Sequence, residues 1–310
     1  MKIAISIGDL NGIGLELALR SHDEVKKICK PIYCINENML GWGAALLDIE
    51  VPKDFEIRDC GKIFEITPGV CSAEAGESSY DSFITAVALA KSNEVSAIVT
   101  LPINKESWSI AGLEYKGHTD ALCDLLGCEA IMMLGCEEMF TILYTHHIPL
   151  CDVAHEIKAK KLKPFLLKVY EELGVDKIAV LGLNPHAGDN GVIGDEDEEI
   201  KKAIMKTNQF LEREVFVGPF VPDMAFTKAN REKFTYFVCM YHDQGLIPLK
   251  VLYFEESINV SLNAGIVRTS VDHGTAFDIA YKDGNPSTLS YINAVKEAVK
   301  LATGKAMLTF

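Results

Sequence analysis

Short apolar runs alternate along the chain with longer segments in which apolar residues recur at helical spacing. Gly, Asn or His commonly stands between a run and the helical segment that follows it. Parallel strands need a crossover segment, usually a helix, to return the chain to the same edge of a sheet. The alternation therefore predicts an α/β fold with a mainly parallel sheet. The predicted strands are Lys2–Ile7, Ala97–Leu101, Ala130–Leu134, Thr141–Thr145, Ile178–Leu183, Thr235–Tyr241 and Ile258–Leu262.

The helical segments show one unusual charge pattern. Five acidic residues, Asp195 to Glu199, open one of them. Negative charge is favoured at a helix N-terminus by the helix dipole. We therefore interpret the run as a solvated helix start rather than as a metal site or a docking site for a basic partner. The predicted helices are Ile13–Arg20, Ser79–Lys91, Ile157–Leu173, Glu196–Glu214, Thr275–Tyr281 and Tyr291–Ala302.

The chain is long enough for a full hydrophobic core. At 310 residues it should bury roughly 70–75% of the surface of its unfolded state, and this length favours about two domains. Hydrophobic residues make up 48% and charged residues 24%, which excludes a disordered or collagen-like chain. The sequence contains no internal repeat and no linker of biased composition, so composition alone places no domain boundary.

Acidic residues outnumber basic ones. The chain has 30 Lys and Arg against 44 Asp and Glu, a net charge of −14 at pH 7. Proteins that bind nucleic acid or anionic membranes without sequence specificity present positive surfaces. The charge therefore disfavours both partners, and an anionic substrate must be captured by local basic groups.

The N-terminus and the cysteines indicate a cytoplasmic protein. The first apolar run stops at Gly8-Asp9, too early for a signal peptide, and no run approaches the 18 or so apolar residues of a membrane span. The nine cysteines are odd in number and form no C-x-x-C pair. We expect them to be reduced, buried thiols.

Three histidines each follow a predicted strand within a few residues: His147, His186 and His242. Ligand sites of open α/β sheets form at the carboxyl ends of strands, where distant segments of the chain meet. Three neutral imidazoles with open coordination positions suit a catalytic Zn, Co, Mn or Fe ion. This spacing is no ligand signature, and each histidine taken alone is better explained as a hydrogen-bonded core or loop residue. His146 and His147 are adjacent, so on a strand only one of them faces the site.

Other polar groups accompany these histidines. They are His118 and Thr119, Lys250, Asn259 and Arg268. The segment Asp272 to Thr275 leads into a predicted helix, which favours an anion contact through backbone N–H groups or an ordinary helix cap. Gly8, Gly12 and Gly14 match neither a dinucleotide fingerprint nor a Walker loop, and we interpret them as a tight strand-to-helix turn.

Several of these segments occur together and in an order found in one family. The chain resembles the 4-hydroxythreonine-4-phosphate dehydrogenases, NAD-dependent enzymes of pyridoxal 5′-phosphate biosynthesis. The three longest segments are highly specific to that family, and together the segments span nearly the whole chain. The full set of matching segments is Gly8-Asp9 with Gly12-Ile13-Gly14 and Glu16, Pro102 with Lys105, Gly117-His118-Thr119, Gly182 to Gly188, Met240 to Gly245, and Arg268 to Ala276. The last three of these are the longest.

The resemblance implies an isocitrate/isopropylmalate dehydrogenase-like fold, with two α/β domains around a central cleft. In such folds the C-terminal segment completes the first domain. We therefore expect residues 1–125 and 270–310 to form a discontinuous first domain and residues 126–269 to form the second. The resemblance also implies a homodimer with the active site at the subunit interface.

Site residues follow from matching the family's motifs to this sequence. The resemblance implies that His147, His186 and His242 bind one divalent metal per active site: Zn, Mg, Co or Mn. It also implies that five residues bind the substrate: His118, Thr119, Lys250, Asn259 and Arg268. Asp243 either orients its neighbouring histidine, transfers a proton, or is an ordinary loop acceptor. We expect NAD, with NADP as the alternative cofactor, to contact the segments that contain Asn184, Gly188, Asp272, Gly274 and Thr275.

The activity implied is oxidation of 4-phosphohydroxy-L-threonine to 2-amino-3-oxo-4-phosphooxybutanoate. That β-keto acid loses CO2 to give 3-amino-2-oxopropyl phosphate, an intermediate of vitamin B6 synthesis. Three alternatives stay open: a relative that oxidises a four-carbon sugar-acid phosphate or a cyclic diol, a metal-dependent hydrolase, and a non-catalytic binding protein.

Four positions depart from the common family pattern. Leu10 and Leu15 replace prolines, Leu101 replaces the glycine before Pro102, and Asp120 replaces a glutamate. The candidate metal ligands and basic residues are intact, so we expect the activity to be retained.

Overall fold

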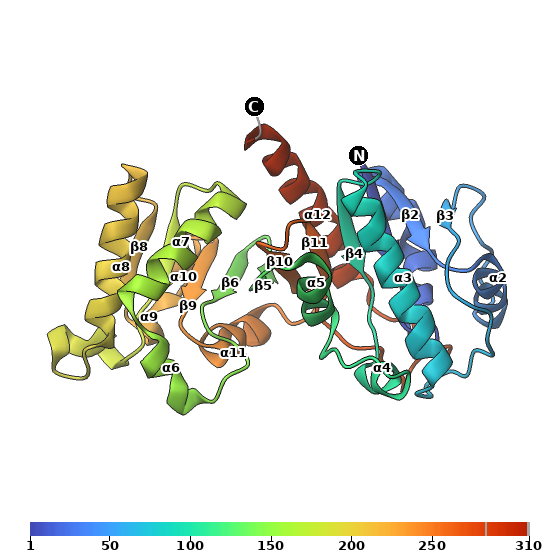
Figure 1. Cartoon of the computed structure of the whole chain (residues 1–310), viewed down its shortest axis with the longest axis horizontal. Helices are drawn as coiled ribbons and strands as arrows, with labels where there is room; N and C mark the ends of the chain where they lie inside the picture. Colours follow the sequence, from blue (N-terminus) through green and yellow to red (C-terminus); the bar gives the residue numbers. More distant parts are fainter. Residues whose placement is uncertain (283, 309–310) are drawn as a thin grey trace. The chain divides into compact units, whose positions relative to one another are not determined.

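The computed structural model describes residues 1–282 and 284–308. They separate into two compact units (Figure 1): unit 1 contains residues 1–130 and those from 258 onward, and unit 2 contains residues 131–257. The predicted second domain, residues 126–269, extends past unit 2 at both ends, and its assignment as a domain stays a prediction. Within the described residues, no helix is both long enough and apolar enough to cross a membrane.

The strands of unit 1 lie in the order β3-β2-β1-β4-β11-β10. All neighbouring pairs are parallel except β10 and β11, which are antiparallel. Helices cover both faces of these strands (Figure 1), so most of the strand residues are buried, the polar ones of β10 and β11 included. The strands are β1 Lys2–Ser6, β2 Lys30–Cys34, β3 Ile57–Arg58, β4 Ala97–Thr100, β10 Ile258–Leu262 and β11 Arg268–Val271.

The two faces of these strands have separate cores. On one face, Ala4 and Ile98 pack with Phe83 of α3 and with Trp108 of α4. On the other face, α12 packs against β4 and β11, and the Thr269 hydroxyl donates to the Ala294 carbonyl at 2.7 Å. The helices described in unit 1 are α1 Gly14–Ile28, α2 Glu37–Leu46, α3 Ala73–Lys91, α4 Lys105–Ile110, α5 His118–Leu126 and α12 Leu289–Leu308.

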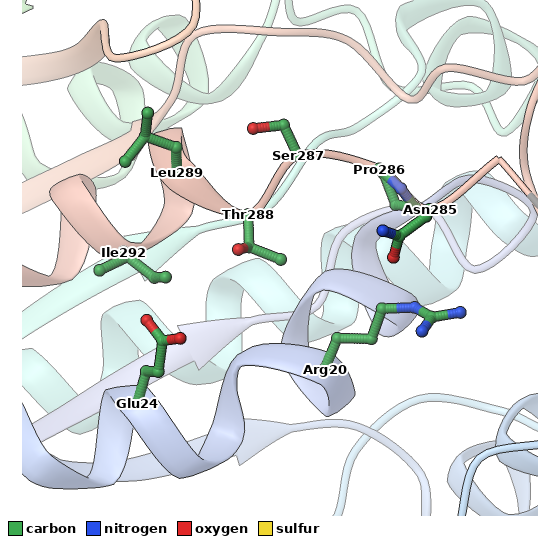
Figure 2. Close-up of a pocket in the computed structure, with 8 residues that line it drawn as sticks. All are labelled: Arg20, Glu24, Asn285, Pro286, Ser287, Thr288, Leu289 and Ile292. Carbon is green, nitrogen blue, oxygen red and sulfur yellow. The ribbon is translucent and has the colours of Figure 1, made fainter.

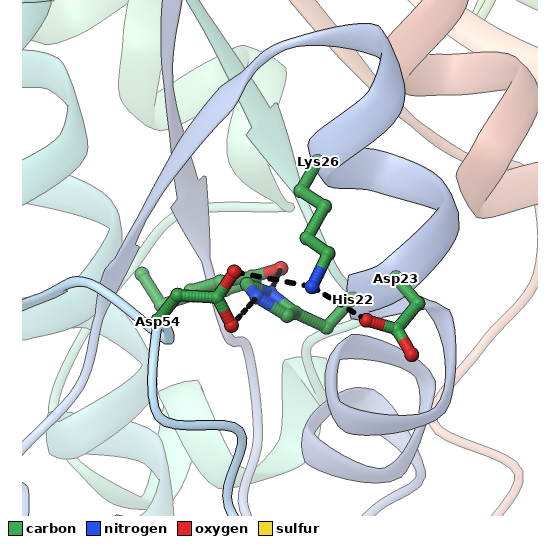
Figure 3. A network of polar contacts seen from close by, with 5 residues as sticks. His22, Asp23, Lys26 and Asp54 are labelled. Carbon is green, nitrogen blue, oxygen red and sulfur yellow. Dashed lines mark hydrogen bonds and ion pairs between the residues drawn. The ribbon is translucent and has the colours of Figure 1, made fainter.

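A polar network ties the segment before β3 to α1 (Figure 3). The His22 ring is buried, with Nδ1 at 3.0 Å from the Tyr33 hydroxyl and Nε2 at 3.3 Å from Asp54 Oδ1. Lys26 donates to both Asp54, at 3.1 Å, and Asp23, at 2.7 Å. Each nitrogen of the buried ring therefore has a partner, which is what a structural histidine requires.

The loop after β1 connects three other segments of unit 1. The Asn11 side chain accepts from Thr67 N and donates to Val70 O, and Ile13 N donates to Thr275 O. Gly8 has φ +78°, and a Cβ there would lie 2.2 Å from the Pro102 carbonyl oxygen. Only glycine fits this approach, so the interpretation of the first glycines as a tight turn agrees with the structure.

The strands of unit 2 lie in the order β5-β6-β9-β7-β8. β5 and β6 form an antiparallel pair, and the other neighbours are parallel. The strands are β5 Ile131–Cys136, β6 Met139–Leu143, β7 Ile178–Leu181, β8 Phe216–Phe220 and β9 Tyr236–Cys239. The helices described are α6 Leu150–Glu156, α7 Ala159–Leu173, the 3₁₀ segment η1 Pro185–Gly191, α8 Glu196–Leu211, α9 Pro222–Ala225, α10 Lys228–Arg231 and α11 His242–Leu252. The prediction of an α/β fold with mainly parallel strands is confirmed.

One predicted helix is wrong. Residues 275–281 form turns, with Ala276 and Tyr281 in the left-handed region at φ 46° and 56°. The segment is held instead by the first loop: Thr275 O accepts from Ile13 N, and the Tyr281 hydroxyl donates to Leu10 O at 2.7 Å. These tertiary hydrogen bonds outweigh a helical propensity that is weak over a segment this short.

The cysteines are all free thiols, as expected, but only some of them are buried. Cys29, Cys34, Cys136 and Cys239 lie in the interior, whereas Cys151 is exposed. The remaining four, Cys60, Cys71, Cys123 and Cys128, are partly exposed. The expectation of burial is therefore wrong for Cys151 and too strong for these four.

Candidate functional site

Arg268 is the first residue of β11, and its side chain meets hydroxyl groups from three other elements. Its Nη1 donates to Ser261 Oγ at 3.0 Å and to Thr119 Oγ1 at 3.3 Å, and its Nη2 donates to Thr100 Oγ1 at 2.8 Å. These four residues are called the Arg268 cluster below. Thr119 lies on α5, one of the helices that cover this face of the sheet.

Strand register explains why the cluster assembles. Ser261 on β10 pairs directly with Arg268, so the two side chains lie on the same face of the sheet. On the other side Arg268 pairs with Ile98, and Thr100 follows two residues later on the same face. The hydroxyls therefore flank the guanidinium from both neighbouring strands.

The charge of Arg268 is buried without a carboxylate partner. The residue is 3% exposed, and no Asp or Glu among the described residues lies within ion-pair distance of it. Burial lowers the pKa of the guanidinium to about 10. The Nε atom has no acceptor among the described residues. A buried cation with an unused donor is suited to binding an anion.

Two further polar residues beside the cluster also have unused atoms. The His118 ring lies against Phe83 and Trp108, at 4.9 and 5.6 Å between ring centroids, and its Nε2 has no partner among the described residues. Burial, together with the charge of Arg268, lowers the pKa of His118 well below 6.5, so the ring is neutral. Asn259 Oδ1 is likewise buried without a partner in the described chain. Asn259 precedes Ser261 by two residues, which places it on the same face.

In unit 2, two of the three candidate metal ligands lie together. The His147 and His242 rings are 5.9 Å apart between centroids, and the His146 ring packs edge-on against His147 at 4.9 Å. Burial and the neighbouring histidines lower the pKa of His146. His147 follows β6, and His242 is the first residue of α11, so the carboxyl ends of the adjacent strands β6 and β9 bring them together.

Asp243 is bonded to the ring of His242. Its Oδ1 lies 2.7 Å from His242 Nδ1, which leaves Nε2 as the ring nitrogen available to a metal ion. A carboxylate on the far nitrogen is the usual support of a metal-binding imidazole. This donor set therefore fits the predicted use of His242 as a ligand.

His186 lies on η1, whose backbone is unusual. Residues 186–190 all have positive φ, and the His186 side chain is exposed. No three His, Cys, Asp or Glu side chains in the described residues gather as a metal site. The structure therefore brings His147 and His242 together but not His186, and the three-histidine site stays a prediction.

The η1 loop is held by a buried carboxylate that the sequence did not reveal. Asp197 is 3% exposed and accepts from Leu183 N at 2.9 Å, Asn184 N at 3.1 Å and Asn184 Nδ2 at 2.9 Å. Glu196 accepts a further bond from Asn184 Nδ2, and Glu199 accepts from Ala159 N. The acidic run does open a helix, as predicted, because α8 begins at Glu196. The prediction that the run is solvated is wrong for Asp197, which is buried, and Glu196 and Glu199 also accept hydrogen bonds from neighbouring segments.

The remaining candidates have mixed surroundings. Lys250 lies in the last turn of α11, with Nζ 3.3 Å from Ser257 Oγ and 5.2 Å from the centroid of the Phe254 ring. Asn184 and Gly188 pack against Asp197, so the Asn184 amide is already engaged within its own loop. Asp272 N donates to Ser290 Oγ at 3.2 Å, and space is open beside Gly274. No helix follows Thr275, so the helix-terminus argument for an anion contact there is wrong.

A pocket of about 690 Å³ elsewhere in unit 1 contains none of these candidates (Figure 2). It is lined by Arg20 and Glu24 of α1, by residues 285–289 and by Ile292. Arg20 donates to Glu16 at 2.7 Å, so its charge is balanced within the unit. Arg268, by contrast, is buried with no carboxylate partner among the described residues.

Comparison with known proteins identifies the family of the chain. Residues 27–298 match the family described as pyridoxal phosphate biosynthetic protein PdxA. A 4-hydroxythreonine-4-phosphate dehydrogenase from Sulfurimonas denitrificans is 56% identical over 97% of this chain and 98% of its own length. The crystal structure of a 4-hydroxythreonine-4-phosphate dehydrogenase from Burkholderia phymatum is 34% identical, with a TM-score of 0.81 over 97% of this chain and 98% of that one.

A more distant structure shares the fold alone. The β-decarboxylating dehydrogenase from Thermococcus kodakarensis is 12% identical, with a TM-score of 0.57 over 99% of this chain and 83% of that one. The prediction of an isocitrate/isopropylmalate dehydrogenase-like fold is confirmed. With a family match over most of its length and relatives of this identity, the chain belongs to the PdxA family of pyridoxal phosphate biosynthetic proteins.

Proposed function

We propose that the chain is a 4-hydroxythreonine-4-phosphate dehydrogenase. It oxidises the secondary hydroxyl of 4-phosphohydroxy-L-threonine with NAD, and the resulting β-keto acid loses CO2 to give 3-amino-2-oxopropyl phosphate. The observation that carries the proposal is the buried, carboxylate-free guanidinium of Arg268, which suits the phosphate of such a substrate. Membership of the chain in the PdxA family supports the same activity.

The substrate-binding residues have distinct tasks in this proposal. Arg268 binds the phosphate through paired N–H groups, Lys250 adds a point charge, and Asn259 adds a neutral hydrogen bond. His118 is neutral because of its burial and the nearby Arg268, so it binds substrate polar groups without competing for the anion. Thr119 binds through its hydroxyl beside Arg268.

His147, His186 and His242 would hold the divalent metal. A metal ion in such a site supplies Lewis-acid stabilisation of negative charge on the reacting oxygen, an effect worth several kcal/mol. Asp243 orients His242 through the 2.7 Å bond to Nδ1, and Asp197 holds the loop that carries His186. The choice among Zn, Mg, Co and Mn depends on availability as well as on ligand type.

NAD accepts the hydride in this proposal, with NADP as the alternative cofactor. The segment Asp272 to Thr275 is the favoured contact region because space is open beside Gly274. Asn184 and Gly188 contribute only through the shape of their loop, since Asp197 already engages them. The nine free thiols support a cytoplasmic location.

The enzyme acts as a homodimer in this proposal. Ile247 and Val251 lie one turn apart on α11 and are 62% and 79% exposed, and Phe254 just beyond the helix is 69% exposed. Neighbouring exposed apolar side chains are a feature of protein contacts, and twofold dimers are the commonest assemblies. Sedimentation of the wild type as a dimer and of Val251→Asp as a monomer is expected. A monomeric wild type would refute the assembly.

Turnover with NAD, measured with and without a chelator, tests the activity. Reduced nicotinamide should form with 4-phosphohydroxy-L-threonine, and chelation should stop its formation. An equal or greater kcat/KM on a four-carbon sugar-acid phosphate or a cyclic diol would overturn the substrate assignment. Consumption of the substrate without NAD, and without formation of reduced nicotinamide, would indicate a hydrolase instead.

A further inference from the structure

Two residues of the Arg268 cluster belong to none of the family motifs. Thr100 ends β4 and Ser261 lies on β10, and they are 0% and 3% exposed. Each hydroxyl accepts a hydrogen bond from the guanidinium, at 2.8 Å and 3.0 Å. Hydroxyls inside a sheet are ordinarily satisfied by backbone carbonyls, as Thr269 is by Ala294. Here they are directed at a side chain that the proposed function uses.

Neutral partners orient a cation without neutralising it. A carboxylate at either position would form an ion pair with Arg268 and compete with any bound anion. The two hydroxyls fix the plane of the guanidinium from opposite sides, because they come from the two strands that flank β11. The Nε–H remains without an acceptor in the described chain and is therefore available to a ligand.

We propose that Thr100 and Ser261 are positioning residues that hold Arg268 for binding a phosphate dianion. They keep its charge uncompensated and fix its orientation, so they set the selectivity of the site for phosphorylated over unphosphorylated substrate. This inference rests on the proposed function for the identity of the substrate. The prediction of anion binding itself does not depend on turnover.

The first measurement is binding of inorganic phosphate to the full-length protein by titration calorimetry. Thr100→Val and Ser261→Ala each remove a hydroxyl bonded to a charged group, so each should weaken phosphate binding about tenfold. In the dehydrogenase assay they should raise KM by a similar factor and leave kcat within about twofold. Thr100→Ser and Ser261→Thr keep the hydroxyl and should restore both values.

Thr269→Val is the matched control. Thr269 is a fully buried neighbour of Arg268 on the same strand, but its hydroxyl is bonded on the opposite face. This variant should leave phosphate binding and KM unchanged. If it weakens phosphate binding as much as Ser261→Ala does, the effect belongs to general packing and the inference is wrong.

The outcomes separate this inference from the proposed function. A wild type that binds phosphate in a Thr100- and Ser261-dependent way but oxidises no phosphorylated substrate supports the inference and refutes the function. A wild type that turns over, with phosphate binding and KM unchanged in Thr100→Val and Ser261→Ala, refutes the inference alone. A wild type that binds no phosphate also overturns it. If one variant fails to fold, the other decides.

Discussion

The Arg268 cluster in unit 1 and the histidines in unit 2 are held in different ways. Three of the four cluster residues lie on paired strands, so the register of the sheet fixes their side chains. His147 and His186 instead lie on segments outside regular strands, and His186 is held through the contacts of its loop with Asp197. The positions of side chains on strands are fixed by the backbone hydrogen bonds between the strands, whereas the positions of those on loops depend on a few specific hydrogen bonds.

The largest effect should come from the loop histidines. His186→Ala should remove the bound metal and lower kcat/KM by at least about 10⁴-fold, since Lewis-acid stabilisation is lost. Metal content by mass spectrometry and steady-state kinetics measure the two effects. The exposed His155 provides the control, because His155→Ala should change neither. A metal-free but fully active His186→Ala enzyme would refute the metal assignment.

Replacing Arg268, the cation on β11, should have the next largest effect on kcat/KM. Arg268→Ala should lower kcat/KM about 10³-fold, mainly through KM, because the phosphate loses its charged partner. Arg268→Lys keeps the charge but not the paired N–H groups, so it should recover only part of the loss. Arg213→Ala removes an exposed arginine paired with Asp176 and should be neutral. A kcat/KM unchanged in Arg268→Ala would exclude Arg268 from substrate binding.

Removal of the Asp197 carboxylate, which holds the η1 loop, should mainly reduce the free energy of unfolding. Asp197→Ala removes the acceptor of three N–H bonds, which should lower the free energy of unfolding by about 4 kcal/mol. Urea unfolding monitored by circular dichroism measures it. Glu198→Ala, one residue along and paired at 3.7 Å with Lys201, should change it by less than about 0.5 kcal/mol. Equal effects of the two substitutions would show that Asp197 has no special role.

The loop after β1 in unit 1 should make the stability of the protein depend on pH, because it contains the buried residue Asp9. Burial raises the pKa of Asp9 from 3.8 to about 6. The folded state therefore binds more protons than the unfolded state between these values, and stability falls as pH rises through that window. The stability of Asp9→Asn relative to wild type should increase by about 2.4 kcal/mol from pH 4 to pH 7. If the difference in free energy of unfolding between Asp9→Asn and wild type is the same at pH 4 and pH 7, the pKa of Asp9 is not raised in the folded protein.

Much of the fold could be predicted from the sequence because strands and crossover helices leave strong periodic signals. The strands that carry Thr100 and Ser261 were predicted, for example, within a residue of their bounds. The helices that begin at His118 and His242 were missed because histidine is a weak helix former and both were interpreted as loop residues. The helix over residues 275–281 was wrong because tertiary hydrogen bonds to the first loop determine that segment.

The site was harder to predict than the fold. The three histidines were selected because each follows a predicted strand, and family motifs then implied roles for them and for Arg268. Thr100 and Ser261 are common residues that become distinctive only through strand register. Asp197 was hidden among four other acidic residues, and burial alone distinguishes it. A sequence pattern does not show which of five adjacent carboxylates faces the interior.

The left-handed backbone at residues 186–190 has a consequence for how this loop tolerates sequence change. Non-glycine residues rarely adopt positive φ, with Asn and Asp the most tolerant and β-branched residues the least. At His186, with φ 54°, two demands therefore coincide: the proposed metal site requires an imidazole, and the backbone requires a side chain compatible with positive φ. A saturation library should separate them, with Asn giving a folded but inactive protein and Val or Ile reducing folding as well.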